Sequence, residues 1–194
     1  MNLFLQGEPG IGKSFLLRQL LSGHVSEIEG FTVQRLYRDG RIAGFRAVIF
    51  DGKFEPIDAE YDSEKPGIFI SKYKKDLSIL EDVINQVEYR CKNESCKIVL
   101  LDEVGGIEIA SENFQKSLYN ILDGGRLCIG VLKSEDNLKR TLRNDCIYNE
   151  YLGCHRELVQ KITGNGYLYT MTLENKNELR PELQLRLNSY MGRG

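Results

Sequence analysis

The chain has 194 residues, of which 41% are hydrophobic and 28% are charged, and its formal net charge is −2. This composition is ordinary for a globular protein, and we expect one domain spanning residues 1–194. The near-neutral charge excludes a strongly basic nucleic-acid-binding protein, and no apolar run reaches the roughly 20 residues that cross a bilayer.

The cysteines and the N-terminal residues indicate in which cellular compartment the protein is expected. Five cysteines are an odd number, and none of them has the close pairing of a structural zinc site. The first residues show no basic segment ahead of an apolar one, as a signal peptide would. We therefore expect a cytoplasmic protein with reduced thiols and no membrane partner. A metal site built from Cys146, Cys154 and His155 is the disfavoured alternative.

The first part of the chain predicts a strand, a helix and a hairpin. Residues 2–6 are an apolar run that stops at a glycine, which is typical of a buried strand. Residues 13–21 carry apolar side chains at helical spacing. Between about residues 30 and 57, strand-like runs flank Asp39 and Gly40, and Asp-Gly in this position is a strong hairpin signal. We expect an antiparallel hairpin region there.

The rest of the chain alternates between strand and helix patterns. Further strands are predicted over residues 97–102, 127–132 and 166–173. Further helices are predicted over residues 76–87, 111–122, a polar stretch from about 134 to 143, and 180–191. The last helix is expected to be broken at its start by Pro181, and no other element is assigned beyond residue 134. The alternation predicts a three-layer α/β domain with a mainly parallel sheet.

The loop after the first strand matches the Walker A or P-loop pattern, G-x-x-x-x-G-K-[ST]. Its residues, which we expect to bind a nucleotide, are Gly7, Glu8, Pro9, Gly10, Ile11, Gly12, Lys13 and Ser14. The glycines let successive N–H groups turn toward a phosphate, and the helix start adds the positive end of its dipole. Lys13 would reach the β- and γ-phosphates, and the Ser14 hydroxyl would bind Mg²⁺. A chance glycine turn is the alternative, but the position between a strand and a helix favours the motif.

Two adjacent acids lie at the end of the apolar strand predicted over residues 97–102. Asp102 is its last residue, and Glu103 follows it. Asp102 falls at the carboxyl end of that strand, where ligands bind in open α/β sheets, and we expect it to bind Mg²⁺ together with Ser14. Glu103 would orient the attacking water or take its proton, so Glu103 and Lys13 are the candidate catalytic residues. The alternative is that Asp102 caps the next element while Glu103 is only solvated. Glu108 is left open between a role behind the site and a surface position.

Phosphoryl transfer usually recruits a further arginine, and tyrosines can stack on a nucleotide base. Candidates for the arginine are Arg126, Arg140 and Arg143, and candidates for stacking are Tyr37, Tyr167 and Tyr169. We favour a solvated helix face for the arginines and half-buried strand packing for the tyrosines, so none of them enters the predicted site.

With these motifs the chain resembles the broad-specificity P-loop nucleoside-triphosphatase family of thermophiles, which has a human cancer-related member. The likeness covers about residues 1–135 and rests on the P-loop and on residues 30–31, 44–46 and 101–105. It implies a RecA-like fold and hydrolysis of ATP, GTP and other nucleoside triphosphates. A small-molecule or nucleotide kinase and a nucleotide-regulated binding module remain alternatives, and the adjacent acids favour hydrolysis.

The chain departs from this family at two places. Similar proteins usually carry an acidic pair soon after Gly-Phe, whereas this chain has Gln34 and Arg35, and its arginine is expected at Arg38. They commonly carry a lysine after the acids of the buried strand, whereas this chain has Gly106. The second departure predicts that a cation is missing from the site.

Overall fold

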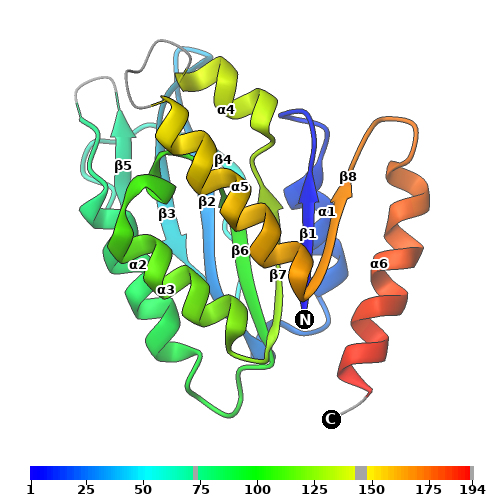
Figure 1. Ribbon diagram of the computed structural model, residues 1–194. Coiled ribbons are helices and arrows are strands. Elements are labelled where there is room, and N and C mark those ends of the chain that lie inside the picture. Colours follow the sequence, from blue (N-terminus) through cyan, green and yellow to red (C-terminus); the bar gives the residue numbers. More distant parts are fainter. Residues whose placement is uncertain (72–73, 143–147, 193–194) are drawn as a thin grey trace.

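The computed structural model describes residues 1–71, 74–142 and 148–192, which form a mixed sheet between two layers of helices (Figure 1). The strands are β1 (Asn2–Gln6), β2 (Ile28–Arg38), β3 (Arg41–Ile49), β4 (Asp58–Glu60), β5 (Ile68–Ser71), β6 (Ile98–Val104), β7 (Leu127–Leu132) and β8 (Gly166–Thr170). They are ordered β5-β3-β2-β6-β7-β1-β8, and β4 also pairs with β2. Only the β2–β3 and β3–β5 pairs of these strands are antiparallel, so the mainly parallel sheet is confirmed.

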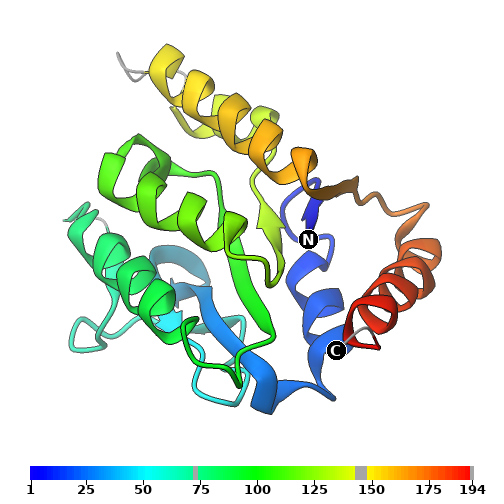
Figure 2. The ribbon, with the colours of Figure 1, turned by 60° about the horizontal axis from the view of Figure 1, so that its bottom comes forward.

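The helices divide between the two faces of the sheet (Figure 2). They are α1 (Lys13–Leu21), α2 (Ser78–Arg90), α3 (Glu112–Asp123), α4 (Glu135–Leu142), α5 (Tyr148–Gly164) and α6 (Lys176–Met191), with short 3₁₀ turns η1 (Val25–Glu27) and η2 (Ile107–Ala110). Side chains of α2, α3 and α5 share one hydrophobic core, and side chains of α1 and α6 share the other. The three-layer α/β prediction is therefore confirmed.

The first four residues of β6, Ile98 to Leu101, are all apolar because both faces of the strand are covered. Val99 and Leu101 lie in the core under α2, α3 and α5, whereas Ile98 and Leu100 lie in the core under α1 and α6. Alternate side chains of a strand point to opposite faces, so a strand covered on both sides needs apolar residues at every position. This burial fixes the register of β6 and thereby the place where its acidic end emerges.

The predicted hairpin is formed by β2 and β3, and its turn is Asp39-Gly40. Both turn residues have positive φ, 52° and 71°, as a type I′ turn requires. Along its other edge β2 pairs with β6 from Ile28 to Thr32 and then with β4 from Arg35 to Tyr37. The upper half of β2 therefore diverges from β6 beyond the Thr32–Asp102 pair.

Two expectations for the C-terminal part were wrong. Helix α5 had no predicted counterpart, although its buried side chains are at helical spacing. Helix α6 begins at Lys176, so Pro181 lies inside it instead of breaking its start. Because Pro181 has no N–H, the carbonyl of Asn177 lacks its usual helical partner, yet the helix continues through this position to Met191. Arg143 and Cys146 lie outside the described residues.

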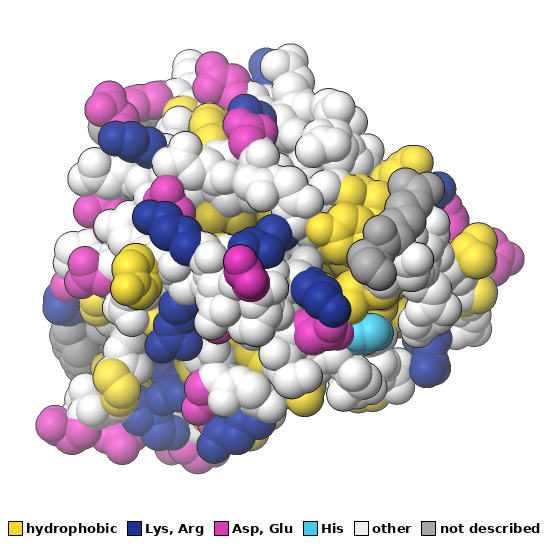
Figure 3. Space-filling model, turned by 90° about the horizontal axis from the view of Figure 1, so that it is seen from below, with side chains coloured by type: hydrophobic (Ala, Val, Ile, Leu, Met, Phe, Trp, Pro, Cys, Tyr) yellow, Lys and Arg dark blue, Asp and Glu magenta, His cyan; other side chains and the backbone are white. Residues whose placement is uncertain are grey.

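The end of the molecule opposite the P-loop carries side chains of both charges. Figure 3 shows basic and acidic side chains lying next to one another on this face, with hydrophobic side chains between them. Lys97, which directly precedes β6, forms an ion pair with Glu27 of η1, with 2.6 Å between Nζ and Oε1. Over the described ranges no helix has both the length and the apolar character to span a membrane.

Candidate active site

The P-loop connects β1 to α1 at the carboxyl edge of the sheet, at the top of Figure 1. Gly7, Gly10 and Gly12 have φ values of 138°, 83° and 97°, which L side chains rarely adopt. Gly12 is also the N-cap of α1, so the loop lies against the N-terminus of that helix. The conformational reason for glycines at these three positions is thus present, together with a helix dipole that favours anions.

The Lys13 side chain folds over the loop. Its Nζ donates hydrogen bonds to the carbonyl oxygens of Gly7 and Glu8, at 2.9 and 2.7 Å. Burial lowers the pKa of this ammonium, while the charges of Glu103 and Asp102 oppose that shift. A partly desolvated cation gains more from an anionic partner than an exposed one does, which suits it to a phosphate.

Ser14 and Asp102 meet beneath the loop. The Ser14 hydroxyl donates a hydrogen bond of 2.7 Å to Oδ1 of Asp102, whose side chain is only 2% exposed. Burial raises the pKa of Asp102 to about 6, although the bond from Ser14 works against the shift. Two hard oxygen ligands side by side fit Mg²⁺, which completes its shell with phosphate oxygens and water. Among the described residues there is no cluster of three His, Cys, Asp or Glu side chains that could hold a metal ion.

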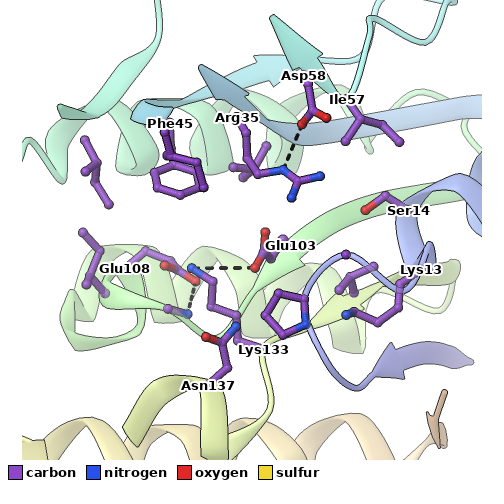
Figure 4. Close-up of a pocket in the computed structure, with 18 of the residues that line it drawn as sticks. Lys13, Ser14, Arg35, Phe45, Ile57, Asp58, Glu103, Glu108, Lys133 and Asn137 are labelled. Atoms are coloured by element: carbon purple, nitrogen blue, oxygen red, sulfur yellow. Dashed lines mark hydrogen bonds and ion pairs between the residues drawn. The ribbon is translucent and has the colours of Figure 1, made fainter. Parts of the chain in front are cut away.

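Glu103 lies in a β-bulge. Asp102 pairs with Val131 and Val104 pairs with Leu132, so Glu103 is an extra residue between two successive pairs of the β6–β7 ladder. Its φ is 146°, which is rare for any residue with a side chain. A bulge redirects a side chain locally, and the Glu103 carboxylate lines the cavity beside the P-loop (Figure 4).

A cation does lie at the site, which corrects the expectation that one is missing. Lys133 Nζ is 3.8 Å from Oε1 of Glu103, and both side chains are about one-third exposed. Lys133 directly follows β7, so the carboxyl end of that predicted strand was an available signal. Glu108 is buried rather than at the surface, and its Oε1 accepts a hydrogen bond of 2.8 Å from the N–H of Gly106.

The hairpin contributes an arginine. Arg35 Nε lies 2.9 Å from Oδ1 of Asp58 on β4, and both residues line the cavity (Figure 4). Arg38, where the arginine was expected, instead lies over the ring of Tyr61 with 4.5 Å between guanidinium carbon and ring centroid. The arginine that lines the cavity is therefore Arg35, and Arg38, where it was expected, does not line the cavity.

The remaining candidates have structural partners. Arg126 lies at the opposite end of β7 and donates hydrogen bonds to the carbonyls of Cys91, Cys96 and Asn93. Arg140 forms an exposed ion pair with Glu8, at 2.9 Å. Other candidates with partners are Tyr167 and Tyr169, which stack on each other and lie against Arg186, and His155, whose Nε2 lies 2.6 Å from the carbonyl oxygen of Lys133.

The cavity beside the P-loop has a volume of about 470 Å³. Its lining includes Pro9, Gly10 and Gly12 of the P-loop and the polar side chains of Lys13, Ser14, Arg35, Asp58, Glu103, Glu108, Lys133 and Asn137. Gly7, Glu8, Ile11 and the buried Asp102 do not line it. Its apolar wall includes Phe31, Phe45, Phe69, Leu80 and Leu138. The arrangement can receive an anionic group at the P-loop and place a carboxylate and an ammonium next to it.

A glycine loop between a strand and a helix, with Lys13, Ser14 and a buried Asp102 around it, defines a P-loop nucleotide-binding protein. The model of the NTPase family matches residues 2–184, and the chain therefore belongs to this family of nucleoside-triphosphatases.

Curated relatives agree over nearly the whole length. The chain is 28% identical over 186 residues to "Nucleoside-triphosphatase THEP1" of Methanocaldococcus jannaschii, covering 94% of this chain and 95% of that protein. It is 25% identical to "Cancer-related nucleoside-triphosphatase homolog" of Bos taurus, with 97% of each chain covered. The crystal structure of THEP1 from Aquifex aeolicus superposes with a TM-score of 0.60 at 18% identity, covering 94% and 96% of the two chains, which shows a shared fold.

Proposed function

We propose that this protein hydrolyses nucleoside triphosphates, ATP and GTP among them, as their Mg²⁺ complexes at the P-loop. In this proposal all eight residues from Gly7 to Ser14 bind the phosphates, and Ser14 and Asp102 hold the metal ion. Mg²⁺ bound there would neutralise charge on the β- and γ-phosphates. Glu103 and Lys13 are the catalytic side chains.

The proposed reaction is an in-line displacement at the γ-phosphorus. A water oxygen bonds to phosphorus as the bond to the β–γ bridging oxygen breaks, which releases nucleoside diphosphate and inorganic phosphate. The Glu103 carboxylate orients this water and accepts a proton from it. Lys13 stabilises charge on the phosphate oxygens, and the N–H groups of the loop add further donors.

The observation that supports this proposal most directly is the Ser14–Asp102 hydrogen bond of 2.7 Å, with Glu103 one residue beyond it. The contact joins the start of α1 to the end of β6, two elements far apart in the sequence. A buried carboxylate held against a P-loop hydroxyl has an evident use as half of a metal site, whereas a core would be better served by an apolar residue.

The test is phosphate release from ATP, GTP, CTP and UTP, with Mg²⁺ and with excess EDTA. We expect release with all four nucleotides and none in EDTA. Lys13→Ala should abolish turnover without lowering the melting temperature, because its ammonium packs in no core. Lys116→Ala, at an exposed position of α3, is the control and should match the parent. Unchanged kinetics in Lys13→Ala would remove the site assignment.

A second candidate, a small-molecule kinase, is favoured by the apolar wall of the cavity, which water alone does not require. The same assays separate the two functions. A kinase would release little phosphate without an acceptor and would yield a phosphorylated second product.

We also propose that residues 1–194 act as one domain in the cytoplasm. The two cores on opposite faces of one sheet support the first statement. The unpaired spacing of the five cysteines supports the second.

A further inference from the structure

Lys133 is held at the edge of the cavity by its backbone. Its N–H donates a hydrogen bond of 2.8 Å to the carbonyl of Val104, which continues the β7–β6 ladder by one residue. Its carbonyl oxygen lies 2.6 Å from Nε2 of His155, a side chain only 2% exposed. Contacts from β6 and α5 thus fix the backbone of Lys133 at the end of β7. Because β7 lies between β6 and β1, this end is at the same edge of the sheet as the P-loop.

The Lys133 side chain reaches into the cavity that Lys13 and Ser14 also line. Its Nζ is 3.8 Å from Oε1 of Glu103, and Figure 4 shows the ammonium directed at that carboxylate. At this distance the two groups attract without forming a tight hydrogen-bonded pair. Both are partly open to the cavity, so each can also contact a bound group.

The Lys133 ammonium lies beside Gly106, the position at which similar proteins commonly carry a lysine. A Cβ atom at position 106 would lie 2.8 Å from Oε2 of Glu108 and 2.9 Å from Nζ of Lys133, so both side chains occupy the space beside this glycine. The φ of Gly106 is −99°, so a left-handed backbone is not the reason for a glycine here. The lack of a side chain at position 106 instead makes room for the Glu108 carboxylate and for Lys133, which follows β7.

We infer that Lys133 is a further catalytic residue, which binds the terminal phosphate of the nucleotide and pairs with Glu103. This inference rests on the proposed function. A carboxylate beside a triphosphate meets strong like-charge repulsion, and a cation between them relieves it. Negative charge on the transferred phosphoryl oxygens in the transition state is what such a cation stabilises. Because a diphosphate lacks that group, Lys133 should matter to triphosphates and not to diphosphates.

The first experiment removes the ammonium. Lys133→Ala should lower kcat by about 30-fold or more, within the range found when one preorganised donor is removed. Its affinity for Mg·ADP should stay within about three-fold, while a non-hydrolysable triphosphate binds more weakly. Lys133→Met keeps the aliphatic stem and should behave alike, so it replaces the alanine variant if that one unfolds. Lys139→Ala, on the exposed surface of α4, is the matched control and should be unaffected.

The second experiment moves the charge. Gly106→Lys in the Lys133→Ala background places a lysine in the space that Nζ has left, once the end of the Glu108 side chain shifts away from the new Cβ. This variant should recover at least about ten-fold of the lost kcat. Recovery would not follow if Lys133 served only to pack β7 against its neighbours. The double variant therefore separates a charge effect from a structural one.

Parental kcat in Lys133→Ala would overturn the inference. The inference would also be overturned if Lys133→Ala lost diphosphate and triphosphate affinity equally and Gly106→Lys in that background recovered no kcat. Failure of the proposed function looks different, since the parent itself would then release no phosphate from any Mg·nucleoside triphosphate.

Discussion

At the residue scale, Glu103 combines an unfavourable backbone with an exposed polar end. A φ of 146° in a non-glycine residue costs on the order of 1–3 kcal/mol, and the ladder on both sides of the bulge holds it in place. A glycine would relieve the strain but would remove the carboxylate. A glutamate at such a strained position is consistent with chemistry at this side chain.

The first prediction separates the two acids of β6. Glu103→Gln should lower turnover by about 100-fold or more while Mg·ATP affinity changes by only a few-fold, because the amide keeps the size but accepts no proton. Single-turnover phosphate release and calorimetric binding measure the two quantities. Glu112→Gln, at an exposed position of α3, is the control. Hydrolysis at the parental rate in Glu103→Gln would show that the carboxylate takes no part in the chemistry.

The second prediction concerns the stability of the nucleotide-free and metal-free protein. The pKa of Asp102 is raised to about 6, so the folded state favours its protonated form. The resulting stability is fully present below the ordinary carboxyl pKa near 4 and is lost as the pH rises through 6. Each pKa unit is worth 1.36 kcal/mol, so ionisation of Asp102 costs about 3 kcal/mol at pH 7.5.

Asp102→Asn imitates the protonated carboxyl and does not titrate. In EDTA it should therefore match the parent near pH 4 and exceed its free energy of unfolding by about 3 kcal/mol at pH 7.5. Urea unfolding at several pH values measures this difference, with exposed Asp51→Asn as the control. The same variant should bind Mg·ATP more weakly, because the metal loses a charged ligand. A stability difference that does not vary with pH would contradict the argument.

At the scale of elements, the pairing of β2 with β6 depends on a close backbone approach. Gly30 faces Leu100 in this pair, with a φ of 146°, and a Cβ there would lie 2.0 Å from the Leu100 carbonyl oxygen. Neither strand can shift freely, since β6 is buried on both faces. This explains the glycine before Phe31 physically, as a steric requirement of the sheet.

The third prediction is that Gly30→Ala destabilises the fold far more than Gly52→Ala. Gly52 also has positive φ, 89°, but no atom lies within 4 Å of its added Cβ. Backbone strain alone should cost about 1–2 kcal/mol at Gly52, and the collision at Gly30 should raise the loss to about 4 kcal/mol or more. Free energies of unfolding in urea provide the comparison. Equal losses would mean that β2 and β6 adjust to the extra atom.

Periodicity and turn chemistry predicted most elements because those signals are local. The P-loop context, the Asp-Gly hairpin and the doubly buried β6 all follow from short stretches of chain. Strands β4 and β5 were not predicted, since they have only three and four residues and depend on edges offered by β2 and β3. In α5 the buried His155 interrupts an otherwise apolar stripe, which hid the helix.

At the scale of the whole molecule, the cavity is assembled from the carboxyl ends of several parallel strands. Lys13 follows β1 through the loop, Glu103 is the residue before the last one of β6, Lys133 follows β7, and Arg35 comes from β2. The strand order, in which β7 lies between β6 and β1, brings them together. Sequence motifs predicted Lys13 and Glu103 as site residues. Lys133 was not predicted, although it follows a predicted strand, because no motif marks it, and Arg35 was not predicted because the sheet topology brings it to the cavity.

The fourth prediction follows from this distribution. All the side chains to which we assign roles address phosphates, metal or water, so the identity of the base should matter little. The values of kcat/KM for ATP, GTP, CTP and UTP should agree within about 100-fold, which corresponds to 2.7 kcal/mol.

Thermal unfolding tests the same idea for the molecule as a whole, because a ligand that binds only the folded state stabilises it by an amount set by its concentration and Kd. At about 100 times Kd the gain is about 2.7 kcal/mol, or roughly 5–10 °C for a chain of this size. Mg·ADP and Mg·GDP should therefore raise the melting temperature by similar amounts, whereas AMP and GMP at equal concentration should have little effect, since they lack the phosphates that the loop receives. Omission of Mg²⁺ should reduce the shift for both diphosphates. A large shift from one monophosphate or one base alone would instead point to a base-reading pocket and to a dedicated substrate.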